Sequence, residues 1–273
     1  MSVIRGLRVI LFYILFALSA VLWFPLCILI SPLLTFEQRY RLICTWWCAA
    51  VMWLCKVILG IKYTVTGREN IPDERCVVLA KHQSTWETFN FCYLFAPVSQ
   101  VLKKELTYIP FAGWALSVLK PIAIDRSSPK QALKQVAKLG AERLADNNWV
   151  LIFPEGTRVL PGQIGKFSRG GASLAVNAGL PVLPIAHNAG RFWPRHGWGK
   201  KSGTIDVRIG PLMYPQGEGS EASAELTQRA FMWIAQAQYD MGDLDEEVAR
   251  SLGLVLRTEA QVIATEAQTN ISG

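Results

Sequence analysis

Histidine and cysteine, which most often build metal sites and disulfide frameworks, are few or poorly spaced in this sequence. Its 273 residues include 3 histidines and 6 cysteines. The cysteines all lie within the first 92 residues, mostly in apolar runs, and none belongs to a C-x-x-C pair. This spacing argues against a metal site and a disulfide scaffold, and it favours buried or lipid-facing thiols in a reducing compartment.

Charged side chains are also scarce, since only 18% of the residues are charged while 51% are apolar. A chain of this composition, without an internal repeat, is neither intrinsically disordered nor fibrous. Its length suits one domain of enzyme size with an apolar attachment.

The charges that are present are unevenly distributed. Residues 98–211 carry 16 basic and 6 acidic groups, whereas residues 212–273 carry 3 basic and 10 acidic groups. A basic middle region favours anionic partners such as phosphates, phospholipid headgroups or nucleic acid, although a solvated basic surface is the alternative. Nucleic acid is disfavoured because the basic residues occur singly or in pairs, with no aromatic-rich platform between them.

Two apolar segments begin the chain. Residues 9–34 contain no charge, and residues 42–61 contain three tryptophans and a single charge, Lys56. The first segment is long enough as a helix to span a hydrocarbon core of about 30 Å. Pro25 and Pro32 would kink or end this helix, so a tilted span, a bent span and a re-entrant hairpin are all open. A cleaved signal peptide is the alternative, and it is disfavoured because it needs a shorter apolar run than residues 9–34 provide.

Beyond residue 67, short apolar runs alternate with longer mixed segments. We expect strands at residues 76–80, 98–102, 121–125, 150–153, 181–186 and 204–209, and helices at residues 84–94, 111–119, 129–147 and 170–178. This alternation predicts an α/β fold with a mostly parallel sheet flanked by helices.

Three regions follow from these patterns. Residues 1–62 are expected to form a membrane-attachment segment of two apolar helices, and residues 63–215 the α/β core. Residues 216–273 would form an acidic C-terminal region, with one amphipathic helix at 222–239 and a frayed tail at 259–273.

The first polar cluster follows the expected strand at 76–80, and ligands of parallel sheets collect at the carboxyl ends of strands. There His82 precedes Glu87 by five residues, with a helix expected to begin at Ser84. A histidine held by a carboxylate can act as a general base toward an alcohol. Alternatively, S-x-x-E from Ser84 to Glu87 is a helix capping box with no catalytic role.

A second cluster, F-P-E-G-T-R at residues 153–158, follows the next central strand. Pro154 would stop the strand, Gly156 would permit a tight or positive-φ turn, and Arg158 could hold a phosphate with its planar fork. An ordinary turn with a surface arginine is the alternative. Other basic residues follow strands as well, namely Lys103, Lys104, Arg126, Lys166 and Arg169, and we expect them to form one electropositive crevice beside His82.

Together, H-x4-E at 82–87, I-D-R at 124–126, F-P-E-G-T-R at 153–158 and V-L-P-I at 182–185 resemble the four motifs of the glycerolipid acyltransferases. Within this superfamily the chain is most similar to the bacterial 1-acyl-sn-glycerol-3-phosphate acyltransferases. The resemblance covers about residues 65–215. One position departs from it, because the family usually has aspartate where this chain has Glu87, whose reach is one methylene longer.

The resemblance implies transfer of an acyl chain from acyl-CoA or acyl-carrier protein to the sn-2 hydroxyl of 1-acyl-glycerol-3-phosphate. The product would be phosphatidate, made for phospholipid biosynthesis without a cofactor or metal. By this resemblance His82 is the general base and Glu87 orients it, while the strand at 182–185 supports the acyl-donor side. The acceptor phosphate is held by Lys104, Arg126 and Arg158, and the pocket is shaped by Glu155, Gly156 and Thr157.

The implied location is a membrane, in particular the bacterial inner membrane with the catalytic domain facing the cytosol. The partners would be membrane phospholipid, lysophosphatidate and acyl-carrier protein. Two other functions are compatible with the same residues. One is an acyltransferase for a different lysolipid, and the other is a non-catalytic phospholipid-binding membrane protein.

Overall fold

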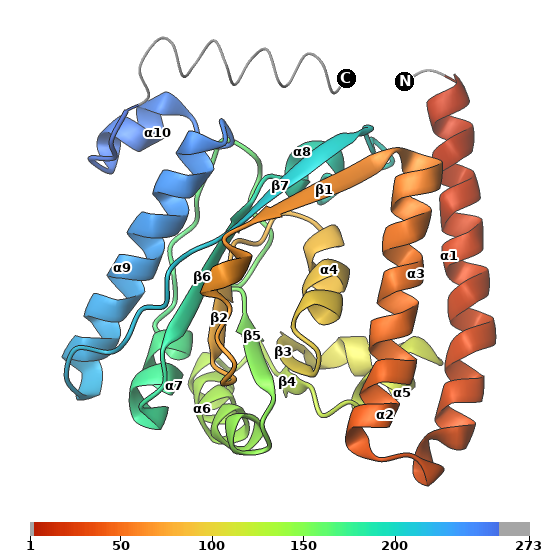
Figure 1. Ribbon diagram of the computed structural model, residues 1–273, viewed down its shortest axis with the longest axis horizontal. Helices are drawn as coiled ribbons and strands as arrows, with labels where there is room; N and C mark the ends of the chain where they lie inside the picture. The colour runs from red at the N-terminus through yellow and green to blue at the C-terminus, as the bar shows by residue number, and fades with distance from the viewer. Residues whose placement is uncertain (1–2, 257–273) are drawn as a thin grey trace.

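A single seven-stranded sheet organises the molecule, in a computed structural model that describes residues 3–256 (Figure 1). Its order is β1-β7-β6-β2-β5-β3-β4. The strands are β1 (Ile61–Thr66), β2 (Val77–Ala80), β3 (Val98–Lys103), β4 (Ile122–Ile124), β5 (Trp149–Ile152), β6 (Val182–His187) and β7 (Gly203–Ile209). Neighbouring strands are parallel except β6 and β7. The α/β fold with a mostly parallel sheet is thereby confirmed.

The central strands are buried along their whole length, as near-continuous apolar runs predict. Every residue of β2, β5 and β6 is buried. Strands β1 and β7 instead alternate between buried and more exposed residues. Strand β1 is the one that the sequence analysis missed, because its alternating I-K-Y-T-V-T sequence directly follows the apolar segment at 42–61.

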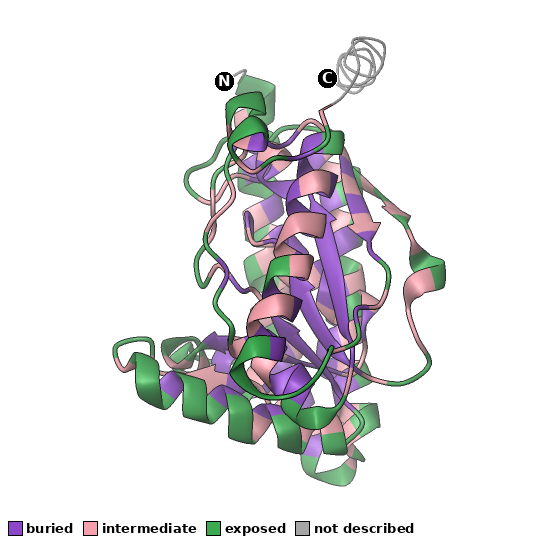
Figure 2. Ribbon diagram, turned by 90° about the vertical axis from the view of Figure 1, so that its left-hand side faces the viewer, coloured by how far each residue is buried: buried purple, intermediate pink, exposed green. Residues whose placement is uncertain are grey.

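Helices cover both faces of this sheet. On one face α6 (Pro129–Ala145), α7 (Gly170–Ala178) and α9 (Gly219–Asp240) share a hydrophobic core with Val77 and Leu79 of β2. On the other face α4 (Trp86–Leu94) and the N-terminal helices share a core with Val78 and Ala80. Figure 2 shows the buried strands behind α9 and the largely exposed surface of α6. Shorter helices are α5 (Ala112–Ser117), α8 (Ala189–Phe192) and α10 (Glu246–Ser251).

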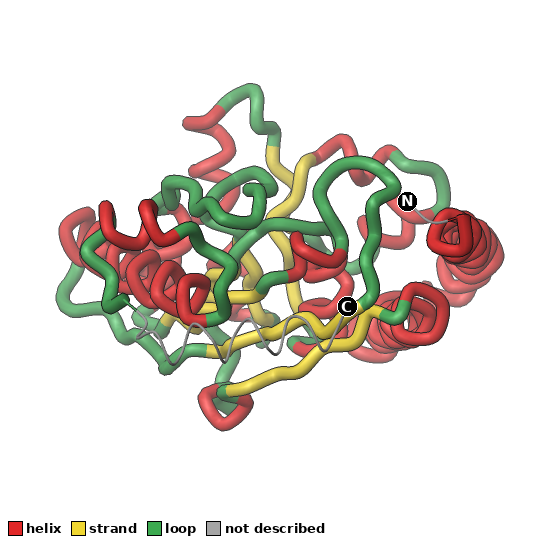
Figure 3. The backbone as a smooth tube through the Cα atoms, turned by 90° about the horizontal axis from the view of Figure 1, so that it is seen from above, coloured by secondary structure: helices red, strands yellow, loops and turns green. Residues whose placement is uncertain are grey.

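The two apolar segments form a helical hairpin beside the sheet (Figures 1 and 3). Helix α1 (Val3–Ile30) continues through Pro25, and Pro32 lies in the 3₁₀ turn that ends it. The return arm runs from Phe36 to Leu59. It consists of α2 (Phe36–Tyr40), a π-helical turn (Arg41–Trp46), α3 (Trp47–Leu54) and a second π-helical turn (Cys55–Leu59).

This hairpin packs on the α/β unit. The rings of Phe12 and Trp193 meet edge to face with centroids 5.4 Å apart, and Lys200 Nζ donates to Tyr13 Oη at 2.5 Å. Such contacts make α1 part of the folded unit, which a cleaved signal peptide would not be. Both arms are long and apolar enough to cross a membrane, and leucines such as Leu22 and Leu29 are exposed. These features are consistent with membrane association.

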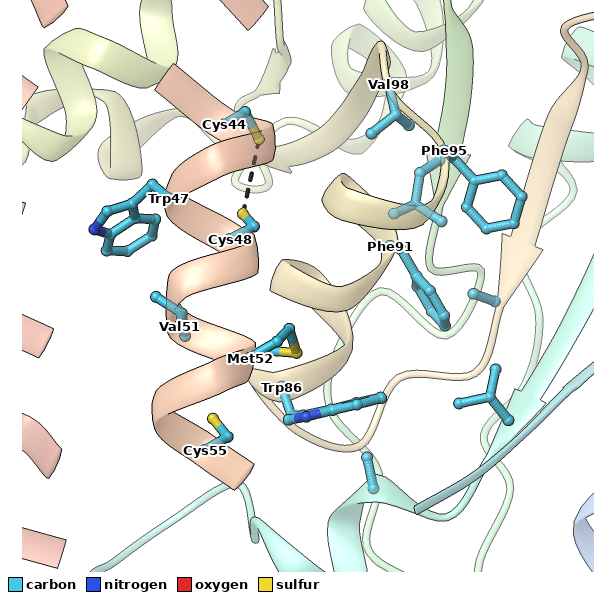
Figure 4. Close-up of a cluster of buried hydrophobic side chains, with 14 of the residues drawn as sticks. Cys44, Trp47, Cys48, Val51, Met52, Cys55, Trp86, Phe91, Phe95 and Val98 are labelled. Atoms are coloured by element: carbon cyan, nitrogen blue, oxygen red, sulfur yellow. Dashed lines mark hydrogen bonds between the residues drawn. The ribbon is translucent and has the colours of Figure 1, made fainter. Parts of the chain in front are cut away.

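Three cysteines meet between the return arm and α4. Cys44 and Cys48 face α4 with their sulfur atoms 3.9 Å apart, near Phe91 (Figure 4). Cys92 of α4 completes a group whose Sγ atoms all lie within 4.8 Å of one another. The cysteines are free thiols, five buried and Cys92 partly so. The expected tail at 259–273 lies outside the described residues.

Candidate active site

The register of the central strands places the two sequence motifs beside each other. Leu79 of β2 pairs with Ile152 of β5, so the segments that leave these parallel strands emerge side by side. The backbone N–H of His82 donates to Glu155 Oε2 at 3.0 Å, and its carbonyl accepts from the N–H of Val159 at 2.8 Å. Both backbone groups of His82 are therefore held by the loop that contains Arg158.

Glu87 serves as both a helix cap and a partner of His82. Its Oε1 atom lies 2.9 Å from His82 Nδ1, and the same atom accepts from the N–H groups of Gln83 and Ser84 at 2.8 and 2.7 Å. The Ser84 hydroxyl in turn accepts from the N–H of Trp86, the first residue of α4, at 3.1 Å. The capping interpretation and the relay interpretation thus describe one arrangement.

The contact between Glu87 and His82 sets the tautomer of the neutral imidazole. Burial opposes ionisation of Glu87, but His187, the hydrogen bond from His82 and the Ser84 N–H outweigh it and hold the pKa of Glu87 below its ordinary value. Because a carboxylate only accepts hydrogen bonds, Nδ1 of His82 carries the proton and Nε2 keeps a lone pair. Within residues 3–256, Nε2 has no hydrogen-bond partner, and 14% of the side chain is exposed.

Phe153 and Glu155 support His82 from the other motif. The Phe153 ring stacks on the imidazole at a centroid distance of 4.1 Å. The side chains of Glu155 and Lys81 have no exposed surface and form a 2.8 Å ion pair. Glu155 also accepts from the N–H of Gly165 at 2.7 Å. Glu155 therefore braces the loop from inside and does not line an open pocket.

The rest of F-P-E-G-T-R forms an exposed turn. Gly156 has φ of +68°, the left-handed conformation that the sequence analysis allowed for it. Gly156 N–H donates to the Phe153 carbonyl at 3.0 Å, which closes the turn. Thr157 is exposed beside it.

Each of the three basic residues expected to hold phosphate contacts one of the motif segments or a residue next to one. Arg158 Nη1 donates to Thr85 Oγ1 at 3.0 Å, in the turn between His82 and α4. Arg126 Nη1 donates to the Gly156 carbonyl at 2.6 Å. Next to it Lys104 pairs with Asp125. This contact, together with hydrogen bonds from Ser127, holds the pKa of Asp125 far below its usual range. The fold thus places Arg158, 76 positions after His82 in the chain, beside the turn that carries His82.

The expected single crevice is wrong for the remaining basic residues. Lys103 pairs with Glu105 at 3.2 Å. Lys166 and Arg169 line a separate cavity against α9 and α10. Residues 182–185 belong to the buried β6 strand beside β2, where they support the sheet from within.

Several supporting residues carried no sequence signal strong enough to find them. Gln83 Nε2 donates to Asp243 Oδ2 at 2.5 Å, and Arg191 Nε donates to the other oxygen at 2.6 Å. Asp243 is fully buried, although the acidic C-terminal region suggested no chemistry. His187 is buried, and its Nε2 lies 2.8 Å from the Lys81 carbonyl. Lys81, which precedes His82, was the one sequence signal, because a lysine buried at a strand end requires a carboxylate partner. That partner is Glu155.

Comparison with known proteins agrees with this geometry. The acyltransferase family model matches residues 62–188. A 1-acyl-sn-glycerol-3-phosphate acyltransferase of Pseudomonas aeruginosa is 57% identical over 249 residues, which are 91% of this chain and 97% of that protein. A protein of the same name from Saccharomyces cerevisiae is 34% identical over 134 residues, which are 48% of this chain and 44% of the yeast protein.

A solved structure has the same fold. The crystal structure of the 1-acyl-sn-glycerophosphate acyltransferase PlsC of Thermotoga maritima superposes with a TM-score of 0.72 at 24% sequence identity. The similarity covers 87% of this chain and 98% of the Thermotoga chain.

Proposed function

The chain belongs to the 1-acyl-sn-glycerol-3-phosphate acyltransferase family, which forms phosphatidate from lysophosphatidate, and we propose that His82 is the general base of this transfer. The observation that carries the proposal is the Nδ1 contact of His82 with the ionised Glu87, which leaves Nε2 as the basic atom. The donor is a thioester, either acyl-CoA or acyl-carrier protein.

The reaction follows from this protonation state. Nε2 of His82 takes the proton of the sn-2 hydroxyl while the hydroxyl oxygen attacks the thioester carbonyl. Glu87 holds the ring and stabilises the imidazolium that forms. When the tetrahedral intermediate collapses, the C–S bond breaks, the ester C–O bond remains, and the imidazolium returns its proton to the departing thiolate. No acyl-enzyme is formed.

Arg158 and Arg126 bind the acceptor phosphate in this proposal. In lysophosphatidate the sn-2 oxygen and the phosphorus are separated by a few bonds, so the phosphate must lie close to His82. Arg158 contacts the turn that carries His82, and one nitrogen of each arginine holds the protein while the others are free to donate. The third cation, Lys104, contributes less net charge because Asp125 already pairs with it.

The enzyme acts on membrane lipid from the cytosolic face of the bacterial inner membrane. The exposed apolar hairpin supports attachment at the place where lysophosphatidate resides. The basic region at 98–211 supports an orientation toward the anionic cytoplasmic leaflet.

Acyl transfer by purified protein, with lysophosphatidate and acyl-CoA as substrates, tests the proposal. His82→Ala should lower kcat by at least about 10²-fold, the typical contribution of a general base, with an unchanged unfolding transition. A change confined to acceptor affinity would contradict the role of His82. The assay should also include lysolipids that lack a phosphomonoester, because activity on those lipids alone would remove Arg158 and Arg126 from their proposed role.

A further inference from the structure

The cavity lined by Lys166 and Arg169 lies beyond the active-site loop, on the side of the sheet opposite the helical hairpin. It has a volume of about 390 Å³, within the range of small-ligand sites. Its walls are the loop at 164–169, the part of α9 from Ala224 to Phe231, and α10 with the residue that follows it. In Figure 1 these helices lie at the far side of the sheet from α1, so the cavity lies away from the membrane-attachment helices.

The chemistry of this cavity is that of an anion site with an apolar wall. Lys166 and Arg169 line it, both side chains are exposed, and neither forms a hydrogen bond or ion pair with any residue in the described part of the chain. No acidic residue is among the described residues that line it. Phe231 lies opposite, half-buried, with its ring edge to face with Phe167 at 5.1 Å.

The same loop joins the cavity to His82. Gly165, directly before Lys166, donates to Glu155 Oε1, and the other oxygen of Glu155 accepts from the His82 N–H. The Ser168 N–H donates to the Pro154 carbonyl at 2.9 Å, which folds the loop back on itself. The cavity therefore adjoins the loop that holds His82, although neither His82 nor the proposed phosphate residues Arg126 and Arg158 line it. The acceptor phosphate is already assigned to those two arginines, so the cavity is left for another anionic group.

We propose that this cavity binds the nucleotide end of a coenzyme A thioester, with its phosphates on Lys166 and Arg169 and its adenine against Phe231. The inference rests on the proposed function, because it assigns the donor of the same reaction. Coenzyme A combines several phosphate charges, an aromatic base and a long pantetheine arm to the thioester. That combination matches a cavity beside the loop that holds His82, with an aromatic wall and two cations that have no partner among the described residues. This binding site adds no chemical step to the acyl transfer.

The charge contacts are tested with the double variant Lys166→Ala/Arg169→Ala. We expect KM for acyl-CoA to rise at least about tenfold, while kcat and KM for lysophosphatidate stay within about twofold. The affinity for free coenzyme A, measured by calorimetry without any reaction, should fall by a similar factor. The matched control, Lys62→Ala/Lys138→Ala, removes two exposed lysines outside the cavity and should change neither quantity.

A second variant tests the space independently of charge. Ala224→Trp places a large ring into the cavity from α9 and should also raise KM for acyl-CoA, with an unfolding transition like that of the wild type. Unchanged coenzyme A affinity in both variants would overturn the proposal, and so would an effect confined to acyl-carrier protein. If His82→Ala still abolishes transfer in that case, the proposed function stands and only the donor site is lost.

Discussion

At the scale of the residue, the contacts of Glu87 join folding to chemistry. One carboxylate oxygen accepts from His82 and from two backbone N–H groups at the start of α4. The ionised form therefore stabilises the fold, and it also fixes the tautomer of the base. The cations of the proposed phosphate site differ in how far a carboxylate already balances their charge, since Lys104 pairs with Asp125 whereas Arg158 contacts a hydroxyl.

The first prediction at this scale concerns acid stability. Because the pKa of Glu87 is lower in the fold than its ordinary value of 4.5, its ionisation stabilises the protein at neutral pH. This contribution is present above the unfolded pKa and is lost as pH falls through the folded value. We expect the difference in unfolding free energy between wild type and Glu87→Gln to be largest near neutral pH and to shrink below pH 4.5. Denaturant titrations across this range measure it, and a pH-independent difference would contradict it.

The second prediction separates the cations of the acceptor site. Arg158→Ala should raise KM for lysophosphatidate at least about tenfold, because a charge-assisted contact to the phosphate is lost. Lys104→Ala should have a smaller effect, since Asp125 already balances its charge. Lys103→Ala, which removes a surface lysine paired with Glu105, is the control. Equal effects of Arg158→Ala and Lys104→Ala would refute this ranking.

At the scale of the element, the segment after α9 braces the turn that carries His82. Asp243 lies between α9 and α10, where it holds Gln83 and Arg191, and its carbonyl accepts from the Gly162 N–H at 2.9 Å. The side-chain amide oxygen of Gln83 accepts from the Gly190 N–H at 3.1 Å. The segments that follow β2, β5 and β6 are therefore joined at one buried residue, Asp243, through its carboxylate and its backbone carbonyl.

Asp243→Ala should affect both stability and turnover. Loss of the carboxylate leaves buried donors without a partner, which costs about 1–3 kcal/mol of unfolding free energy. Because Gln83 is adjacent to His82, kcat should fall while KM for both substrates changes little. Asp240→Ala, at an exposed position near the end of α9, is the control. A loss of stability with unchanged kcat in the folded fraction would limit Asp243 to a structural role.

At the scale of the whole molecule, the hairpin lies on the opposite side of the sheet from α9 and α10, which line the cavity proposed for the donor (Figure 1). Lipid acceptor and soluble donor would approach His82 from these two sides. The hairpin exposes apolar side chains on the outer surface of α1, while its inner surface packs through residues such as Phe12 and Tyr13.

Leu22→Asp tests attachment by that outer surface. Leu22 is 73% exposed, so the substitution leaves the packing intact. Placing a carboxylate in lipid costs about 2.5–3.5 kcal/mol at a helix centre, so the partition coefficient onto phospholipid vesicles should fall at least about tenfold. Val255→Asp, at a 78% exposed position outside the hairpin, should leave it unchanged. Similar partitioning of both variants would contradict attachment through α1.

Local sequence alone determined the elements, because apolar periodicity and strand-stopping residues act over short distances. It predicted six of the seven strands, the helix at 170–178 and the motif residues His82, Glu87 and Arg158. Strand β1 was missed because its alternating pattern follows an apolar helix without a break.

Only the tertiary structure decided which residues meet. The parallel register of β2 and β5 joined His82 to Glu155, and the return of the chain after α9 brought Asp243 to Gln83. It also separated Lys166 and Arg169 from Arg158, although all three follow the same strand. Contacts between residues far apart in the chain depend on how the sheet and its loops pack, and no local pattern encodes that packing.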